Sequence, residues 1–197
     1  MSLPLLAADG LSLPVAVSVE VCILAGGLSS RMGRNKARLR LGRRTLLGQI
    51  RVNAAELALP LRVVREDLVA RCGPLGGIHS ALKTTRQAAV LFLACDMPFV
   101  SSAILRLLLK KFDGKRPLSA TANKSPGFPL ILPRTLLPTV EQLIVQRQFS
   151  LHNLTVVTRA RLVSLPSDVL FNINTPADLA FAKKRLISAQ EQLVKRR

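Results

Sequence analysis

The sequence predicts an α/β protein, a three-layer α/β/α sandwich built on a Rossmann-like, mostly parallel sheet. Short β-branched or apolar segments alternate with longer amphipathic ones, which is the β-α-β order of a parallel sheet. The segment 89–94 (AVLFLA) is almost wholly apolar, as a strand covered by helices on both faces must be. Ligands of such sheets bind at the carboxyl ends of the strands. We therefore look for functional residues just after the predicted strands.

The pattern assigns the elements in chain order. In the first half we expect strands at 19–25, 61–65 and 89–94, and helices at 45–59, 77–86 and 101–112. In the second half we expect strands at 117–122, 128–132 and 161–165, and helices at 133–146 and 176–193. The last helix has Thr175 as its expected N-cap and Pro176 at its first position.

The domain organisation is simple. Residues 1–18 are apolar, contain prolines and have no Lys or Arg, so they lack the basic start of a secretory signal. We interpret 1–18 as a flexible N-terminal extension and 19–197 as a single domain, because no linker-like segment interrupts it. No uninterrupted apolar run of about twenty residues occurs, so we expect neither a membrane span nor a membrane partner.

The charge balance favours anionic partners. The chain has 29 Lys and Arg against 11 Asp and Glu, a formal net charge of +18. Nucleotides, phosphorylated cofactors, nucleic acid or an acidic protein surface all fit this excess, and a merely solvated basic surface is the plainer alternative. The chain has seven Phe and no Trp or Tyr, which argues against a base-stacking platform for single-stranded nucleic acid.

The cysteines indicate a reducing compartment. Cys22, Cys72 and Cys95 are an odd number and lack C-x-x-C spacing. Buried free thiols are the expectation, and they point to a cytoplasmic protein.

The glycine-rich stretch 24–36 (LAGGLSSRMGRNK) follows the first predicted strand. The paired Gly26 and Gly27 allow backbone N–H groups to approach a phosphate without an intervening Cβ. Arg31 and Lys36 can add charged donors. The stretch matches neither G-x-G-x-x-G nor G-x-x-x-x-G-K-[ST], so neither a dinucleotide-binding fold nor a P-loop is indicated. A glycine-rich turn with surface basic residues is the alternative interpretation.

Asp96 ends the apolar strand, in the sequence ACDMP at 94–98. A carboxylate at a strand tip can hold a hard cation against phosphate oxygens, and Mg²⁺ typically uses one or two carboxylates together with substrate phosphates and water. The alternative is that Asp96 caps the helix expected near Ser101.

These two motifs together resemble the signatures of nucleotidyltransferases that activate cofactors and sugars. The double glycine is most similar to that of the molybdenum cofactor guanylyltransferases, and CDMP is likewise a family pattern. The resemblance runs in order through Gly73–Ile78 (GPLGGI), Gly127–Leu130 (GFPL) and 171–179 (FNINTPADL). It departs at Asn35, where the family often has Asp, and in the short passage before Gly73.

The resemblance implies a nucleotidyltransferase-type sheet and roles for particular residues. The backbone that would face the guanine belongs to Leu24, Ala25 and Gly26. The residues that would address the triphosphate are Gly27, Arg31 and Lys36. Asp96 would be the metal ligand, and with Arg31 and Lys36 it completes the expected catalytic set.

Three further polar residues are weaker candidates. Asn172 and Asn174 would orient phosphate or help to complete the metal coordination, although Thr175 alone already explains a helix start. Asp67 is the best local candidate for a contact to the ribose or base, because it lies in the shortened passage.

The implied reaction transfers GMP from GTP to the terminal phosphate of molybdopterin, with or without bound molybdenum, and releases pyrophosphate with Mg²⁺ as cofactor. Cytidylyl transfer to molybdopterin and nucleotidyl transfer to a sugar or isoprenoid phosphate are the enzyme alternatives. A catalytically silent carrier of the cofactor and a basic nucleic-acid-binding protein are the others. The resemblance also implies delivery to apo-molybdoenzymes or cofactor-insertion factors.

Overall fold

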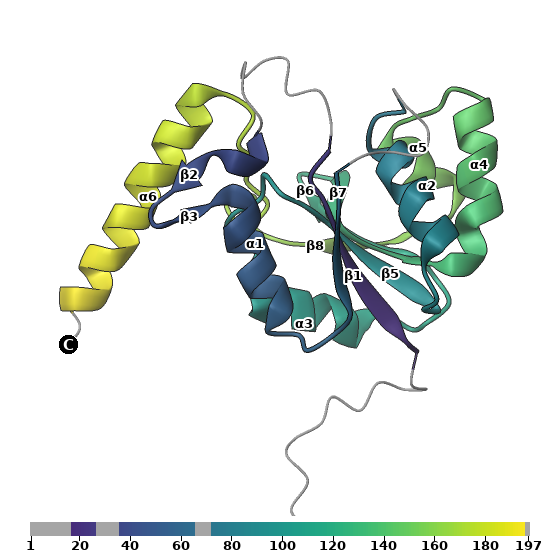
Figure 1. Ribbon diagram of the computed structural model, residues 1–197, viewed down its shortest axis with the longest axis horizontal. Helices are drawn as coiled ribbons and strands as arrows, with labels where there is room; N and C mark the ends of the chain where they lie inside the picture. The colour runs from purple at the N-terminus through teal and green to yellow at the C-terminus, as the bar shows by residue number, and fades with distance from the viewer. Residues whose placement is uncertain (1–16, 27–35, 66–71, 196–197) are drawn as a thin grey trace, which may run out of the picture.

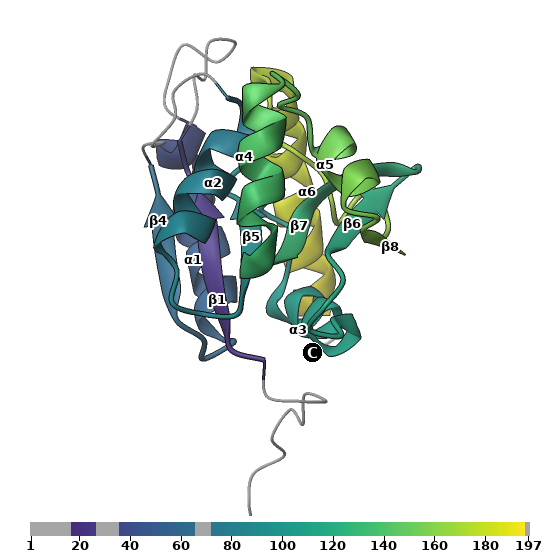
Figure 2. The same cartoon turned by 90° about the vertical axis from the view of Figure 1, so that its right-hand side faces the viewer.

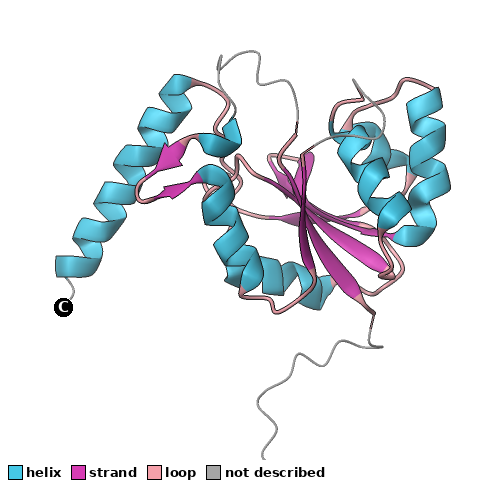
Figure 3. Cartoon of the chain, in the orientation of Figure 1, coloured by secondary structure: helices cyan, strands magenta, loops and turns pink. Residues whose placement is uncertain are grey.

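The computed structural model describes residues 17–26, 36–65 and 72–195. Its centre is a six-stranded sheet in the order β4-β1-β5-β7-β6-β8, with helices on both faces (Figures 1, 2 and 3). The strands of this sheet are β1 (Val19–Leu24), β4 (Leu61–Val64), β5 (Ala89–Ala94), β6 (Leu118–Ala122), β7 (Ser125–Pro133) and β8 (Arg161–Ser164). The predicted three-layer α/β architecture is confirmed.

The sheet is mostly parallel, with one reversed strand. β1 pairs in parallel with β4 and β5, and β6 pairs in parallel with β8. β7 runs antiparallel to both β5 and β6 and joins the two parallel parts. The carboxyl ends of the other five strands therefore share one edge of the sheet.

The two helical layers bury opposite faces of the sheet. α1 (Leu46–Ala55) and α3 (Ser102–Lys111) cover one face, and α2 (Pro74–Thr84), α4 (Leu137–Val145) and α5 (Leu151–Val157) cover the other (Figure 1). β5 supplies both cores by strand alternation. Leu91 and Leu93 lie in the cluster that includes Ile50 of α1, whereas Phe92 lies in the cluster of α2 and α4. This explains why β5 has no polar face.

A small peripheral unit lies beside the sandwich. The hairpin of β2 (Arg40–Leu41) and β3 (Arg44–Thr45) packs with the long α6 (Pro176–Lys195), as Figure 1 shows. Leu41, Leu46, Ile173 and Ala182 form its buried centre. The hairpin is preceded by the 3-10 turn η1 (Lys36–Arg38). The unit connects the segment after the glycine-rich loop to the C-terminal helix.

Several boundaries differ from the sequence prediction. α2 begins at Pro74 rather than 77, because Gly73 adopts φ of 54° and Pro74 occupies the first turn. α1 ends at Ala55 rather than 59, where Ala58 turns the chain with φ of 55°. A 3-10 turn, η2 (Arg134–Leu136), precedes α4, which delays that helix from the expected 133. α5 and the β2–β3 hairpin were not predicted.

The remaining expectations concern the chain start and the cysteines. Ser18 contacts the domain, since its hydroxyl accepts from Ala88 N at 3.1 Å, while residues 1–16 lie outside the described residues. All three cysteines are buried, and Cys22 and Cys95 are free, as expected. Within the described ranges no helix has the length and apolar character needed to cross a membrane.

The packing predicts that the stability of the fold depends strongly on Phe92. This side chain of β5 is fully buried against α2 and α4. Phe92→Ala should lower the free energy of unfolding by about 3–5 kcal/mol, because it leaves a cavity that the sheet cannot close. Denaturant unfolding measures the change. Leu107→Ala is the control, since Leu107 on α3 is 39% exposed. Equal losses in the two variants would contradict this packing.

Candidate active site

The ends of three parallel strands meet at the carboxyl edge of the sheet. The register aligns Leu24 of β1 with Ala94 of β5 and with Val64 of β4. The backbone continues this pairing, because Cys95 N donates to Leu24 O at 3.2 Å and Ala25 N donates to Val64 O at 2.8 Å. The start of the glycine-rich turn therefore lies between the tips of β4 and β5, next to the segment that carries Asp96.

A lysine, a carboxylate and an amide converge at this edge. The Lys36 ammonium donates to Asn174 Oδ1 at 2.7 Å and lies 3.3 Å from Asp96 Oδ2. The Lys36 and Asp96 side chains are 19% and 20% exposed, so the ion pair is only partly screened by water. Residues from the two ends of the domain thus form one charged cluster.

Hydrogen bonds fix the segment that carries Asn174. Ile173 N donates to Asp96 O at 2.9 Å, which ties the segment to the tip of β5. Asp178 Oδ2 accepts from the N–H groups of Asn174 at 2.9 Å and Thr175 at 2.8 Å, while Thr175 Oγ1 accepts from Asp178 N at 3.1 Å. This is the reciprocal cap of a helix start, and it confirms Thr175 as N-cap. The hydrogen bond from the Asn174 backbone, followed by that from the Thr175 side chain, lowers the pKa of Asp178.

Gly26 is required by close backbone packing. A Cβ at this position would lie 2.6 Å from Arg65 O, well inside contact distance. The turn after β1 can therefore approach the end of β4 only because residue 26 has no side chain.

Two alternative roles for residues at the tip of β5 are disfavoured: a helix cap for Asp96 and a nucleophile for Cys95. Ser101, not Asp96, caps α3, because its hydroxyl accepts from Ile104 N at 3.4 Å. Burial, followed by the nearby Asp96 charge, raises the pKa of the Cys95 thiol to about 11. Cys95 is therefore a neutral thiol at physiological pH rather than a thiolate nucleophile.

The donor set fits a cation that shares its coordination with substrate. Within the described part of the chain there is no group of three or more His, Cys, Asp or Glu that could hold a metal ion by itself. Asp96 offers one carboxylate next to a lysine that favours phosphate. A single carboxylate with substrate phosphates and water suits Mg²⁺, whereas it does not suit a structural zinc site.

The described residues bring together most of the predicted site. Leu24, Ala25 and Gly26 lie at the strand edge beside the cluster of Lys36, Asp96 and Asn174. Asn172 is exposed and lies two residues before Asn174. The predicted residues Gly27, Arg31 and Asp67 lie outside the described residues.

Sequence reasoning missed Asp178, which supports the site through the backbone of Asn174 and Thr175. The T-x-x-D spacing of 175–178 was the available signal, since it is a capping-box pattern. The sequence also does not reveal the partner of His79, whose Nε2 lies 3.3 Å from Glu141 Oε1 on α4.

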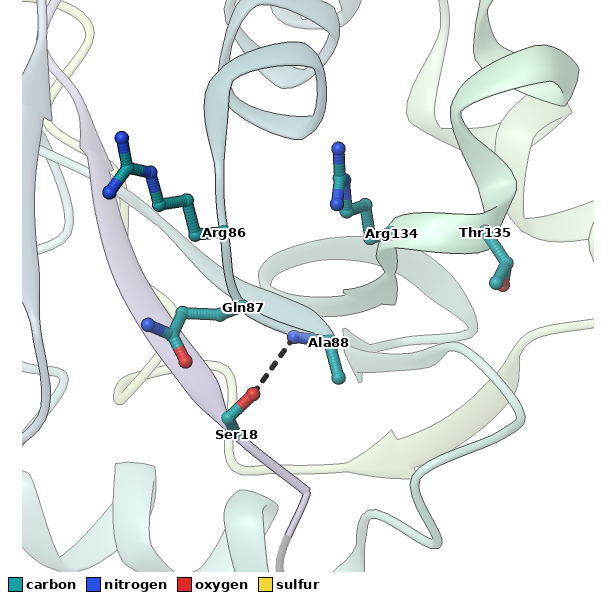
Figure 4. Close-up of a pocket in the computed structure, with 6 residues that line it drawn as sticks. All are labelled: Ser18, Arg86, Gln87, Ala88, Arg134 and Thr135. Carbon is teal, nitrogen blue, oxygen red and sulfur yellow. Dashed lines mark hydrogen bonds between the residues drawn. The ribbon is translucent and has the colours of Figure 1, made fainter.

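A hollow at the opposite edge of the sheet is separate from this cluster. It has a volume of about 520 Å³ and is lined by Ser18, Arg86, Gln87, Ala88, Arg134 and Thr135 (Figure 4). These residues lie around the amino ends of β1 and β5. The hydrogen bond from Arg134 N to Ala88 O places the end of β7 beside the start of β5. This hollow and the charged cluster therefore lie at different edges of the sheet.

The fold and the cluster define a class: an α/β protein with a mostly parallel sheet and with a lysine, a carboxylate and an amide gathered at its carboxyl edge. Comparison with known protein families is more specific than this class. The chain matches the model of the MobA-like NTP transferase domain over residues 21–64 and 50–162, and it belongs to this family.

Relatives agree over most of the chain. The molybdenum cofactor guanylyltransferase of Rhizobium leguminosarum is 31% identical, with 83% of this chain and 91% of that protein covered. A relative from Carboxydothermus hydrogenoformans is 30% identical, with 82% of this chain and 93% of that protein covered.

Solved structures show the same fold. The molybdopterin-guanine dinucleotide biosynthesis protein A from Archaeoglobus fulgidus superposes with a TM-score of 0.65 at 23% identity, covering 86% of this chain and 99% of that one. A Mycobacterium tuberculosis protein solved in complex with manganese superposes with a TM-score of 0.58 at 17% identity, covering 85% and 99%.

The packing at residue 26 gives a test of the site. Gly26→Ala should force the turn away from Arg65 and weaken GTP binding by on the order of tenfold or more, since misplacement of about 1 Å is costly at such sites. Gly127→Ala is the matched control, because its Cβ would meet nothing within 4 Å. Titration calorimetry measures both affinities. Unchanged GTP affinity in Gly26→Ala would exclude this turn from the nucleotide site.

Proposed function

We propose that this protein transfers GMP from GTP to the terminal phosphate of molybdopterin, giving the guanine dinucleotide cofactor and pyrophosphate. The single observation that carries the proposal is the cluster of Lys36, Asp96 and Asn174 beside the β1 turn, in a chain of the MobA-like NTP transferase family. The names of the curated relatives support the guanylyl group and the molybdenum cofactor.

The proposed reaction is an in-line displacement. An oxygen of the acceptor phosphate attacks the α-phosphorus of GTP, the bond from that phosphorus to the bridging oxygen breaks, and pyrophosphate leaves with the electron pair. Such a reaction needs little covalent help from protein, so catalysis consists of positioning and of neutralising phosphate charge.

The described residues divide these tasks. Lys36, held by Asn174, supplies a positive charge for the triphosphate. The backbone at Leu24, Ala25 and Gly26 holds the nucleotide at the strand edge. Asp96 would hold Mg²⁺, which when bound neutralises phosphate oxygens. Gly27 and Arg31 are proposed to contact the triphosphate, and Asp67 and Asn172 stay weaker candidates.

A divalent cation is also supported by the structural neighbour solved with manganese. Mg²⁺ is our specific proposal, because one carboxylate plus phosphate oxygens is its usual environment in nucleotide sites. The buried free thiols of Cys22 and Cys95 support a cytoplasmic location. Delivery of the product to apo-molybdoenzymes stays a prediction.

The carboxylate gives the first test of the reaction. Asp96→Asn should lower the rate of GTP-dependent pyrophosphate release by on the order of 10²–10³, because it removes a charge that acts on the reacting phosphates. Asp113→Asn is the control: Asp113 lies in the turn after α3 and accepts from Lys115 N and Arg116 N. It changes the net charge equally and should keep the wild-type rate. Near wild-type turnover in Asp96→Asn would remove Asp96 from the mechanism.

Nucleotide choice gives the second test, which separates guanylyl transfer from cytidylyl and other transfer. With Mg²⁺ present, GTP at about 100 times its Kd should raise Tm by roughly 5–10 °C, and CTP, UTP and ATP should raise it much less. Thermal unfolding with each nucleotide measures this. A larger shift with CTP would replace the guanylyl assignment, and indifference to all four together with steeply salt-dependent DNA binding would favour the nucleic-acid alternative.

A further inference from the structure

An aromatic cluster is formed by three phenylalanines on segments that adjoin Asp96 and Asn174 in the sequence. The ring centroids of Phe99 and Phe171 are 6.2 Å apart, and those of Phe171 and Phe181 are 5.2 Å apart. The rings are tilted by 46° and 44°, within the favourable range for aromatic pairs. Segments that follow β5, precede α6 and lie within α6 thus contribute one ring each.

The cluster adjoins the charged site along the chain. Phe99 follows Asp96 by three residues, and Phe171 precedes Asn174 by three residues, which is a span of at most about 10 Å. Asp178 and Phe181 are three residues apart on α6 and so share one side of that helix. Asp178 bonds to the backbone of Asn174, so the side of α6 that carries Asp178 and Phe181 begins next to Asn174.

The cluster and the nucleotide turn reach the tip of β5 through different backbone bonds. Cys95 N donates to Leu24 O, which joins the β1 turn to the residue before Asp96. Ile173 N donates to Asp96 O, which joins the segment that carries Phe171 to Asp96 itself. A nucleotide held at Gly26 and an acceptor held at the aromatic cluster would therefore both lie next to Asp96.

The inner part of the cluster is rigidly held. The Arg185 guanidinium lies 4.2 Å from the centroid of the Phe99 ring, and it donates to Asp168 O and Asp168 Oδ2, both at 2.6 Å. Phe99 and Phe171 are half-buried and pack against the core of the hairpin unit. The cation–π contact and the ion pair leave these rings little freedom.

The outer ring is different, because Phe181 is 54% exposed. It is not needed to dock α6, since Leu179, Ala182 and Leu186 already pack against the hairpin. A large exposed ring backed by two fixed rings is the arrangement that stacks a planar ligand.

We propose that Phe181, supported by Phe171 and Phe99, stacks against the fused pterin ring system of the acceptor and so determines acceptor specificity. This inference rests on the proposed function for the identity of the acceptor. The acceptor phosphate would reach the Lys36–Asp96 cluster while its ring lies on Phe181. The three rings together form an aromatic platform. This platform explains how a site whose charges bind phosphate can also distinguish the ring system to which the phosphate is attached.

The experiment measures binding of molybdopterin to the full chain by anaerobic equilibrium dialysis without GTP or Mg²⁺, and the free ligand is quantified after its oxidation to a fluorescent pterin. Phe181→Ala should weaken this binding by on the order of tenfold, as expected for the loss of one stacking partner. Phe181→Trp should retain it. The KM for GTP should stay unchanged in both variants.

Ile187→Ala is the matched control, because Ile187 is 55% exposed and lies six residues further along α6, on another side of the helix. Its binding should equal that of wild type, and circular dichroism checks that all variants are folded. Unchanged molybdopterin binding in Phe181→Ala would overturn the proposal, and so would an equal loss in Ile187→Ala. A rise only in the KM for GTP would assign the ring to the nucleotide base and would also overturn it.

The two proposals fail separately. Wild-type protein that binds molybdopterin through Phe181 but releases no pyrophosphate from GTP would sink the proposed function and leave the aromatic platform standing. Wild-type protein that binds no molybdopterin would sink the platform.

Discussion

The site depends on the parallel register between β1 and β5. Six residue pairs, from Val19 opposite Ala89 to Leu24 opposite Ala94, set how far each strand extends. This alignment places Gly26 and Asp96 at the same edge, and the bond from Cys95 N to Leu24 O continues it past the strands. A slip of one residue would exchange the faces of β5, and both faces are packed. The two cores that stabilise the sheet therefore also fix the position of the carboxylate.

The second constraint comes from the far end of the chain. Lys36 is oriented by Asn174, whose backbone is held by Asp178 at the start of α6. The same helix packs against the β2–β3 hairpin, which follows η1 and thus follows Lys36 directly. Both partners of the Lys36–Asn174 bond are consequently attached to one peripheral unit. Displacement of α6 would loosen the lysine from two directions at once.

The parts of this arrangement that could be predicted from the sequence are those with a local physical cause. The apolar run of β5 predicted a strand covered on both faces. The glycine turn and Asp96 each follow a predicted strand directly, which indicated that they lie at its carboxyl end. The direction of β7 could not be predicted, because strand alternation does not encode whether a neighbour is parallel. α5 has seven residues and the hairpin strands have two each, which are too short for a periodic signal. The bonds of Asp178 are local, and its T-x-x-D pattern could have indicated a helix start, but the place of that start beside Lys36 depends on long-range contacts.

The pairing of Lys36 with Asp96 has a consequence for the proposed reaction. Each charge is about one-fifth exposed, so neither is fully hydrated, and each depends on the other for compensation. In the proposed reaction, phosphate groups that enter the site would compete for the Lys36 ammonium, and its departure from Asp96 would leave a partly desolvated carboxylate in need of a cation. Nucleotide binding and divalent-cation binding at Asp96 would thereby be coupled through one lysine. By linkage the coupling is reciprocal, so that a cation at Asp96 in turn frees Lys36 for the triphosphate.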